Sequence, residues 1–466
     1  MANAQGSATQ KKADRQLLKI REMREILEFD FETDKDGAGI FKPLKSSPGF
    51  EKDSYRASDL HKEIEPWLTA LFQSEHLSLL AGAGLTTAVH YHVTGKAPRG
   101  FALRDYAAFD AQIKAEAARS AEEMGRGEAN PEDQLRSALR IADGLRILIN
   151  GNAEEEPWKS LATQLATLDT EIKTAIQSLI AGILQSEQGI LSQREKREQA
   201  LIMLVSFLMS FASRTGTRDR LHIFTTNYDR LIEFGAELAG IRLIDRFVGA
   251  LSPIFRASRL DIDLHYNPPG IRGEPRYLEG VARFTKLHGS LDWVDEDRQV
   301  RRIALPFGAK EHKPYIPDDA ANVLIYPNDA KDRETTDYPY VELHRDFAAA
   351  VCRPNSVLVT YGYSFGDDHI NRVIRDMLTI PSTHLVILNH GDTGQRLTRF
   401  YRDSRRGPQI TALIGSRLGM LSDLVDYYLP KPAIDRASIR MTELLRARGM
   451  AGTDAHTKQK DEGEQS

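Results

Sequence analysis

Cysteine is almost absent from this sequence, since Cys352 is the single one among 466 residues. A disulfide within the chain is therefore excluded, and so is a zinc site built from several cysteine thiolates. Cys352 lies in an apolar stretch, and we expect it to be a small buried hydrophobic residue. Sparse cysteine is typical of a reducing compartment, so we expect a cytoplasmic protein.

Long apolar runs are also missing. No run approaches the roughly 18 apolar residues that a membrane-spanning helix needs. The longest candidate, residues 200–212, is interpreted as a buried helix. Residues 1–16 carry basic side chains but no apolar segment, so we expect neither a signal peptide nor contact with a membrane.

A large excess of one charge is lacking as well. The net charge of −4 gives no general attraction to nucleic acid or to an anionic surface, and direct binding of nucleic acid is not expected. What the chain does have is length and 41% hydrophobic residues, enough for one large domain with insertions or for two domains.

Apolar runs alternate with helical patterns along the middle of the chain. Runs typical of buried parallel strands are LSLL, HIFT, VLVTYG and HLVILN, at residues 77–80, 222–225, 357–362 and 384–389. This alternation predicts an α/β fold with a Rossmann-like parallel sheet and helices on both faces. Apolar residues three and four positions apart predict a large helical insertion at about 103–213.

The domain organisation follows from these patterns. Residues 1–60 are predicted to be an N-terminal arm with a helix over Gln16–Glu28, and residues 61–435 to be the main domain. Residues 436–466 are predicted to be a tail whose polar end is disordered. Within the main domain, 241–285 and 294–335 are predicted to be irregular, and helices are predicted over Tyr340–Val351 and 367–378.

A glycine turn follows the first apolar run. Gly82, Ala83 and Gly84 lie between the predicted strand and a helical pattern that contains Thr86. Such a turn lets backbone N–H groups and the positive end of a helix approach a pyrophosphate. Position 87 is a threonine and not the third glycine of the dehydrogenase fingerprint, which argues against a hydride-transfer domain. A purely structural turn is the alternative.

Polar side chains follow the second apolar run. Thr226, Asn227 and Asp229 stand at the carboxyl end of the predicted strand, where ligands of open α/β sheets bind. The amide of Asn227 can donate and accept hydrogen bonds, and Asp229 can hold an amide or a ribose hydroxyl. The alternative is a helix cap, which asparagine and aspartate also favour.

Three further sites carry chemistry. His288 precedes Gly289, and a histidine on a tight turn can be a general base or a structural side chain. Gly362 and Ser364 place a turn and a hydroxyl after the strand VLVTYG, where Asp368 could cap the next helix. Asn389 closes the strand HLVILN, where its amide could hold a ribose.

Taken in order, the five sites resemble the sirtuin-like superfamily. They match its glycine-alanine-glycine turn, its asparagine–aspartate motif, its histidine–glycine motif, its glycine-x-serine turn and its late strand that ends in asparagine. The stretches KLHGSLDW and YGYSFGDDHIN look like the prokaryotic sirtuin-like branch found in phage-defence proteins. The resemblance covers residues 76 to about 395, interrupted by insertions.

This resemblance implies that NAD⁺ is the ligand and the substrate. Asn227 would position the nicotinamide ribose and the attacking water, and His288 would act as base. Asp229 would hold the nicotinamide amide. The remaining residues of the motifs would bind the pyrophosphate, the phosphates and the adenosine ribose: Gly82, Ala83, Gly84, Thr86, Thr226, Gly362, Ser364 and Asn389.

The sequence departs from the deacylase branch in one decisive respect. Deacylases carry a module with four cysteines that holds zinc, and this chain has one cysteine, so no metal is expected. The segment Phe101–Asp105 is a candidate for the deacylase segment that follows the glycine turn. The resulting hypothesis is an NAD⁺ glycohydrolase that yields nicotinamide and ADP-ribose, and the alternative is a non-catalytic module that senses NAD⁺ or ADP-ribose.

An NADase that ran freely would deplete its host, so we expect control by assembly or by a partner. The N-terminal arm and the helical insertion are the expected contact surfaces. The resemblance implies an effector of bacterial antiviral defence that depletes NAD⁺. It also implies a homo-oligomer, with a HerA-type ATPase or an Argonaute-like protein as possible partner.

Overall fold

The computed structural model describes a large part of the chain. The described residues are 14–21, 23–34, 37, 39–123, 127–150, 155–214, 218–258, 262–266, 276–296, 299–311, 323–325 and 338–431. The predicted tail, 436–466, lies outside them, and so do residues 1–13 of the predicted arm.

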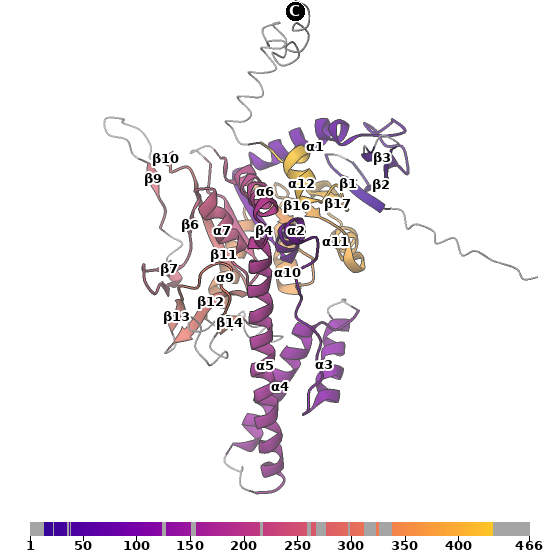
Figure 1. The fold of residues 1–466 in the computed structure, drawn as a ribbon. Coiled ribbons are helices and arrows are strands. Elements are labelled where there is room, and N and C mark those ends of the chain that lie inside the picture. Colours follow the sequence, from indigo (N-terminus) through magenta and orange to yellow (C-terminus); the bar gives the residue numbers. More distant parts are fainter. Residues whose placement is uncertain are drawn as a thin grey trace, which may run out of the picture.

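A ten-stranded sheet lies at the centre of the fold (Figure 1). Its order is β3-β2-β1-β17-β16-β15-β4-β5-β11-β6, and the strands from β17 to β6 run parallel to their neighbours. The predicted α/β fold is therefore confirmed. The strands are β1 (Asp14–Lys19), β2 (Leu27–Thr33), β3 (Gly39–Pro43), β4 (His76–Ala81), β5 (His222–Thr225), β6 (Arg242–Ile244), β11 (Val281–Lys286), β15 (Ser356–Tyr361), β16 (His384–Asn389) and β17 (Ile410–Ile414).

Helices cover both faces of the sheet, because successive strand residues point to opposite sides. Leu79 of β4 packs into the apolar cluster on one face, and Leu80 packs into the cluster on the other. The first face carries α1 (Ala57–Phe72), α2 (Ala83–Thr94), α6 (Arg194–Ala212), α7 (Leu231–Leu238), α12 (Leu421–Asp423) and the π-helical turn η5 (Leu424–Tyr428). The second face carries α9 (Tyr340–Val351), α10 (Asp368–Met377) and α11 (Arg396–Ser404).

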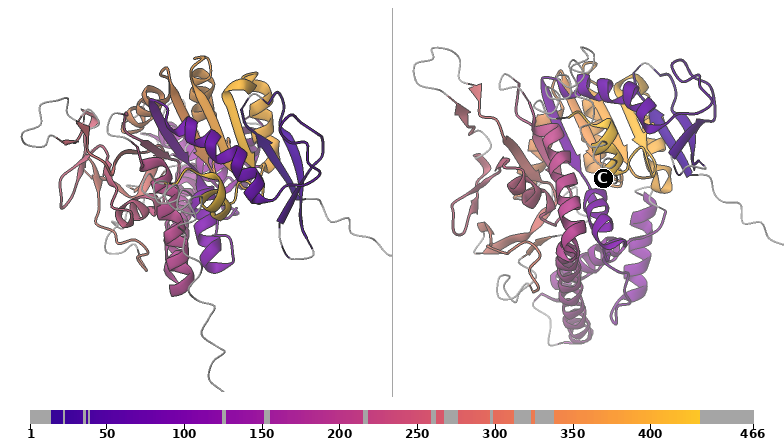
Figure 2. Two further views of the ribbon diagram at one scale, coloured as in Figure 1. Left: turned by 90° about the horizontal axis from the view of Figure 1, so that it is seen from above. Right: turned by 45° about the horizontal axis from the view of Figure 1, so that its top comes forward.

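Three helices of the predicted insertion form a separate layer, which we call the helical module. They are α3 (Asp110–Glu123), α4 (Pro131–Ile149) and the 34-residue α5 (Trp158–Leu191). They share an apolar cluster that contains Leu135 and Ile176 and also takes in Leu291 and Val294 of the segment 289–296. Figures 1 and 2 show the module extending away from the sheet, with α5 running back to it. The fourth helix of the insertion, α6, packs on the sheet and not in the module.

Short strands form two smaller sheets beside the main one. A five-stranded sheet has the order β14-β12-β13-β8-β7, and β9 pairs with β10. These strands are β7 (Phe247–Val248), β8 (Ile254–Phe255), β9 (His265–Tyr266), β10 (Arg276–Tyr277), β12 (Gly289–Glu296), β13 (Gln299–Arg302) and β14 (Val323–Ile325). Single 3-10 turns lie at Thr393–Gln395 and Gly407–Gln409.

The helix predicted over Gln16–Glu28 is wrong. The stretch instead contains β1 and the start of β2, which pair antiparallel, and β1 also pairs with β17. Leu18 and Phe29 point into the core, while Arg15 and Glu28 form an exposed cross-strand ion pair at 2.9 Å. Pairing with the edge of the parallel sheet overrides the helical preference of this mixed-charge segment.

Two other expectations need correction. Residues 281–285 were expected to be irregular, yet they lie in β11 inside the parallel sheet. The charged residues of VARFTK hid this strand, because Lys286 is buried against Glu233 and does not face water. Cys352, expected to be buried, is only partly so, and burial raises the pKa of its thiol. No helix in the described ranges is long and apolar enough to cross a membrane.

A substitution at Lys19 tests the packing of β1. Lys19 is fully buried, no described residue accepts a hydrogen bond from its Nζ, and burial lowers its pKa to about 8. Because a buried unpaired cation is destabilising, we expect Lys19→Met to stabilise the fold by about 1–3 kcal/mol at pH 7. Thermal unfolding measures this, with the exposed Lys45→Met as control.

The pH dependence gives a second readout of the same variant. The lysine has its ordinary pKa near 10.5 when unfolded, so the unfolded state binds more protons between pH 8 and 10.5. The free energy of unfolding of the wild type should therefore include a contribution from Lys19 that increases with pH across this window. Lys19→Met should lack this contribution. A lower melting temperature for Lys19→Met than for wild type at pH 7 would contradict the analysis.

Candidate functional site

The strand order reverses between β4 and β15. From β4 the chain proceeds to β5 and β11 on one side, and from β15 it proceeds to β16 and β17 on the other. Open α/β sheets bind ligands at such a reversal, beyond the carboxyl ends of the strands. The turns after β4, β5, β11, β15 and β16 carry the five motifs from the sequence, so the structure brings them to one edge.

Three glycines make a backbone contact at this reversal. The N–H of Gly84 donates to the carbonyl of Gly362 at 3.0 Å, and the N–H of Gly82 donates to that of Tyr361 at 2.9 Å. A Cβ on Gly84 would lie 2.5 Å from Cα of Gly362, and one on Gly82 would lie 2.5 Å from its carbonyl oxygen. Gly362 also has φ +62°, in the left-handed region. Side chains are therefore excluded at all three positions.

Helix α2 begins at this contact. Its N-cap is Gly82, which offers no side-chain acceptor, and its first residue, Ala83, is exposed. The amino-terminal end of α2 thus faces the carboxyl edge of the sheet without a side-chain cap. The partial positive charge at this end of the helix suits a phosphate or pyrophosphate.

A directed chain of hydrogen bonds fixes the amide of Asn227. Asn227 is buried, and its Nδ2 donates to the carbonyl of Gly82 and to Oγ1 of Thr86, both at 3.1 Å. Thr86 in turn donates its hydroxyl proton to Oδ2 of Asp229 at 2.7 Å. Since a carboxylate only accepts, Oγ1 of Thr86 must accept from Asn227, which must present its NH₂ group there.

These hydrogen bonds use the NH₂ group of Asn227, and no described residue donates a hydrogen bond to its Oδ1. This oxygen is the one part of the amide available to a ligand hydroxyl or a water. Asp229 has both oxygens engaged in this structure, since Oδ1 accepts from the N–H of Leu231 at 3.1 Å. Thr226, predicted to bind cofactor, is partly buried, and its N–H donates to Ala81 at 3.3 Å.

Lys286 clamps the loop that carries Asn227. Its buried Nζ donates to the carbonyl of Asp229 at 2.5 Å and lies 3.4 Å from that of Tyr228. It also pairs with Oε1 of Glu233 at 3.0 Å, whose own pKa burial raises. Lys286 had no predicted role, and its place two residues before His288 was the only signal.

His288 lies on the turn between β11 and β12 and is oriented by a carboxylate. Its Nε2 is 2.9 Å from Oδ2 of Asp367, and its side chain is 22% exposed. A carboxylate acceptor places the imidazole proton on Nε2, so Nδ1 carries the lone pair. No described residue pairs with Nδ1, and the ring of Tyr228 lies 6.4 Å away between centroids.

Asp367 was missed by the sequence analysis, which considered its neighbour Asp368 as the helix cap. The structure shows that Asp367 is the cap of α10, because Oδ1 accepts from the N–H groups of His369 and Ile370. Its other oxygen is left for His288. The DD pair in the motif was the available signal, but sequence alone does not say which aspartate precedes the helix.

The last two predicted residues lie farther along the same edge. Ser364 is exposed on the turn after β15. Asn389 ends β16, its Nδ2 donates to the carbonyl of Gly391 at 2.7 Å, and its own carbonyl accepts from Gly415 at 2.9 Å. The roles of these two residues in ligand binding remain predictions.

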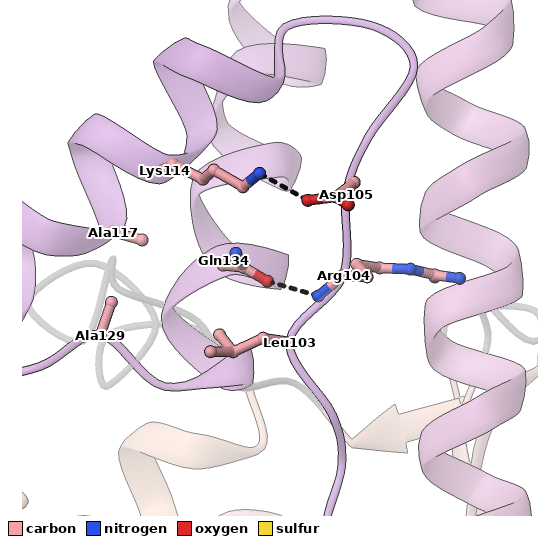
Figure 3. Close-up of a pocket in the computed structure, with 7 residues that line it drawn as sticks. All are labelled: Leu103, Arg104, Asp105, Lys114, Ala117, Ala129 and Gln134. Carbon is pink, nitrogen blue, oxygen red and sulfur yellow. Dashed lines mark hydrogen bonds and ion pairs between the residues drawn. The ribbon is translucent and has the colours of Figure 1, made fainter.

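The segment Phe101–Asp105 packs against the helical module. Together with α3 and α4 it lines a pocket there (Figure 3). The N–H of Arg104 donates to Gln134 at 3.0 Å, and Lys114 pairs with Asp105 at 2.6 Å. Arg104 and Asp105 thus bind residues of the module. These contacts do not support a role for the segment beside the glycine turn. In the described ranges no group of three or more His, Cys, Asp or Glu side chains could hold a metal.

Residues 221–405 match the family model of the SIR2-like domain. The matched range begins just before β5 and ends just after α11, so it contains Asn227, His288 and Asp367. The glycine turn at 82–84 lies outside the match but completes the site in space. The SIR2-like superfamily consists of NAD-dependent enzymes, and no curated protein matches the chain.

Two glycine substitutions test the backbone contact between the turns after β4 and β15. Gly84 and Gly144 are both helical, but only Gly84 has backbone within 3 Å of an added Cβ, and Gly144 has open space. We expect Gly84→Ala to destabilise by about 1–3 kcal/mol through overpacking. Gly144→Ala should stabilise by about 0.5–1 kcal/mol through helix propensity. Denaturant unfolding of both variants measures this, and a stabilised Gly84→Ala would show that the turns are not in contact.

Proposed function

We propose that this protein is an NAD⁺ glycohydrolase that converts NAD⁺ and water into nicotinamide and ADP-ribose. The observation that carries the proposal is the pairing of two pre-oriented groups at one edge of the sheet. Asn227 presents Oδ1, and His288, held by Asp367, presents Nδ1. Asn227 also donates to the carbonyl of Gly82, the N-cap of α2.

Binding would use the backbone more than side chains. The turn of Gly82 and Gly84 and the start of α2 would hold the pyrophosphate, because the positive end of the α2 dipole favours an anion there. Ser364 and Asn389, farther along the edge, would hold the adenosine side. This placement would direct the nicotinamide ribose toward Asn227 and His288.

The reaction breaks the bond between C1′ of the ribose and the nicotinamide nitrogen and forms a bond between C1′ and water oxygen. The pyridinium nitrogen takes the bonding electrons, so nicotinamide leaves neutral. Positive charge develops on the ribose in the transition state. Oδ1 of Asn227 would accept a hydrogen bond from the water or a ribose hydroxyl, which orients the nucleophile against C1′.

His288 would remove the proton that the water loses. Its Nδ1 would accept this proton, and the resulting imidazolium would be stabilised by the carboxylate of Asp367. Asp367 thereby acts as the positioning residue of the pair, since it selects the tautomer and the ring orientation. Because the whole chain has one cysteine, the four-cysteine zinc module of deacylases is missing, which favours hydrolysis over transfer of an acyl group.

The cellular setting is part of the proposal. We infer a cytoplasmic effector of bacterial antiviral defence that depletes NAD⁺ when it is activated. Activation would come through self-assembly or through a partner such as a HerA-type ATPase or an Argonaute-like protein. The helical module, which extends from the sheet, is the surface that we propose for such contacts (Figure 2).

Consumption of NAD⁺ by the purified protein tests the activity. We expect wild type to release nicotinamide and ADP-ribose in equal amounts, by chromatography. Asn227→Ala and His288→Ala should each lower the rate by a factor of about 10²–10⁴. The exposed His92→Ala on α2 is the matched control and should behave as wild type. If wild type binds NAD⁺ but leaves it intact, even with its genomic neighbour present, a sensing module becomes the better reading.

Substitutions at Thr86 distinguish the orientation of Asn227 from the binding of NAD⁺. Thr86→Val keeps the shape but removes the hydroxyl that fixes the amide, so we expect kcat to fall roughly five- to tenfold, as for the loss of one hydrogen bond. KM should change little, and Thr86→Ser should restore kcat. Steady-state kinetics of both variants measure this. Equal activity of the valine and serine variants would show that the hydroxyl is not needed.

A further inference from the structure

Glu187 is a fully buried carboxylate near the end of α5. Its partner is Arg230, which directly follows the Asn227 loop and is the N-cap of α7. Oε1 accepts from Nε of Arg230 at 3.1 Å, and Oε2 accepts from Nη2 at 2.5 Å. This parallel two-bond geometry is the strongest and most directional form of an arginine–carboxylate pair.

The same carboxylate also binds backbone. Oε1 accepts the N–H of Arg230 at 3.1 Å, and Oε2 accepts the N–H of Gly308 at 3.0 Å. Arg230 in turn donates to the carbonyls of Leu305 and Pro306. One carboxylate therefore fixes three segments: the long helix of the module, the Asn227 loop and the turn at 305–308.

One turn of α5 also reaches the other half of the site. Gly189 packs so closely on α2 that a Cβ there would lie 2.3 Å from Nε2 of His90. α2 is the helix whose amino-terminal end forms the glycine turn. The end of α5 thus contacts both the proposed pyrophosphate element and the proposed catalytic loop.

Tyr228, between Asn227 and Asp229, provides a second contact with the module. Its ring packs against the apolar cluster of the module, and its pKa is raised well above 10 by burial, with a smaller contribution from Glu132 of α4. The Asn227 loop therefore contacts this cluster through Tyr228 and α5 through Arg230.

We propose that Glu187 is a positioning residue for the Asn227 loop, through which the position of α5 controls turnover. This inference rests on the proposed NAD⁺ hydrolysis, because its kinetic readout requires that reaction. The seated α5 fixes the carboxyl end of the loop, since the N–H of Arg230 and its guanidinium both donate to the Glu187 carboxylate. Displacement of α5 would release the loop and misplace Oδ1 of Asn227, while the glycine contact would keep its shape.

The test compares full-length variants of the pair. Glu187→Gln removes the charge but keeps the side-chain volume, and Arg230→Lys keeps the charge but loses the fork. Glu195→Gln, on the exposed start of α6, makes the same chemical change without a described partner and is the matched control. The readouts are kcat and KM for NAD⁺, the Kd for ADP-ribose by calorimetry, and backbone hydrogen exchange of residues 226–231.

We expect Glu187→Gln and Arg230→Lys to lower kcat at least tenfold. KM and the Kd for ADP-ribose should stay within about threefold of wild type. Exchange of residues 226–231 should become at least tenfold faster, while exchange of 77–80 in β4 stays unchanged. Glu195→Gln should match wild type in every readout.

Two results would overturn the inference. One is a folded Glu187→Gln protein with wild-type kcat and wild-type exchange at 226–231. The other is a joint loss of kcat, ADP-ribose binding and melting temperature in both variants, which would make the pair a general stabiliser of the fold. If wild type shows no NAD⁺ hydrolysis, the proposed function fails, and the exchange of 226–231 still decides whether Glu187 holds the loop.

Discussion

A contact without side chains, between the turn after β4 and the turn after β15, sets the geometry of the whole site. Gly84 and Gly362 touch through their Cα atoms, so the two turns approach more closely than any other residues would allow. This closeness lets β4 and β15 stay paired up to Ala81 and Tyr361, at the very edge of the sheet. The start of α2 and the loops around it take their places from this edge.

Polar interactions then fix the Asn227 loop and His288 beside the glycine contact. Thr86 of α2 orients Asn227 through its hydroxyl. Lys286 binds the carbonyl of Asp229, and Glu187 binds the N–H of Arg230, so both hold the Asn227 loop. His288 receives its orientation from Asp367 across the strand ends. Each of these links joins elements that are distant in sequence, so the site is pre-organised by the fold before a ligand is present.

The sequence predicted what local patterns determine. The apolar runs of β4, β5, β15 and β16 are buried on both faces, which is why the strands and the α/β class could be predicted. The glycine turn, Asn227 and His288 could be found because they follow strand ends, where a parallel sheet collects ligand groups.

The features that the sequence did not predict depend on contacts between residues far apart in the chain. β1 is a strand because β17 offers an edge to pair with, and β11 is a strand although it ends in a lysine, because Glu233 neutralises that charge. The pair Asp367-Asp368 marked a helix cap but not which aspartate orients His288, and Glu187 had no local sign of its importance, since a carboxylate in a helix is ordinary until its partner is known. The periodicity of a sequence does not show which distant segments form ion pairs.

The sheet order has a consequence for the newly made chain. β15 lies next to β4 in the sheet, but the ribosome produces it only after the helical module, β5, β11 and the small sheets have been made. A nascent protein therefore holds Gly82, Asn227 and His288 while it still lacks Gly362 and Asp367. The proposed NADase would be inert throughout this period, and translation itself would protect the cell until nearly the whole polypeptide has emerged.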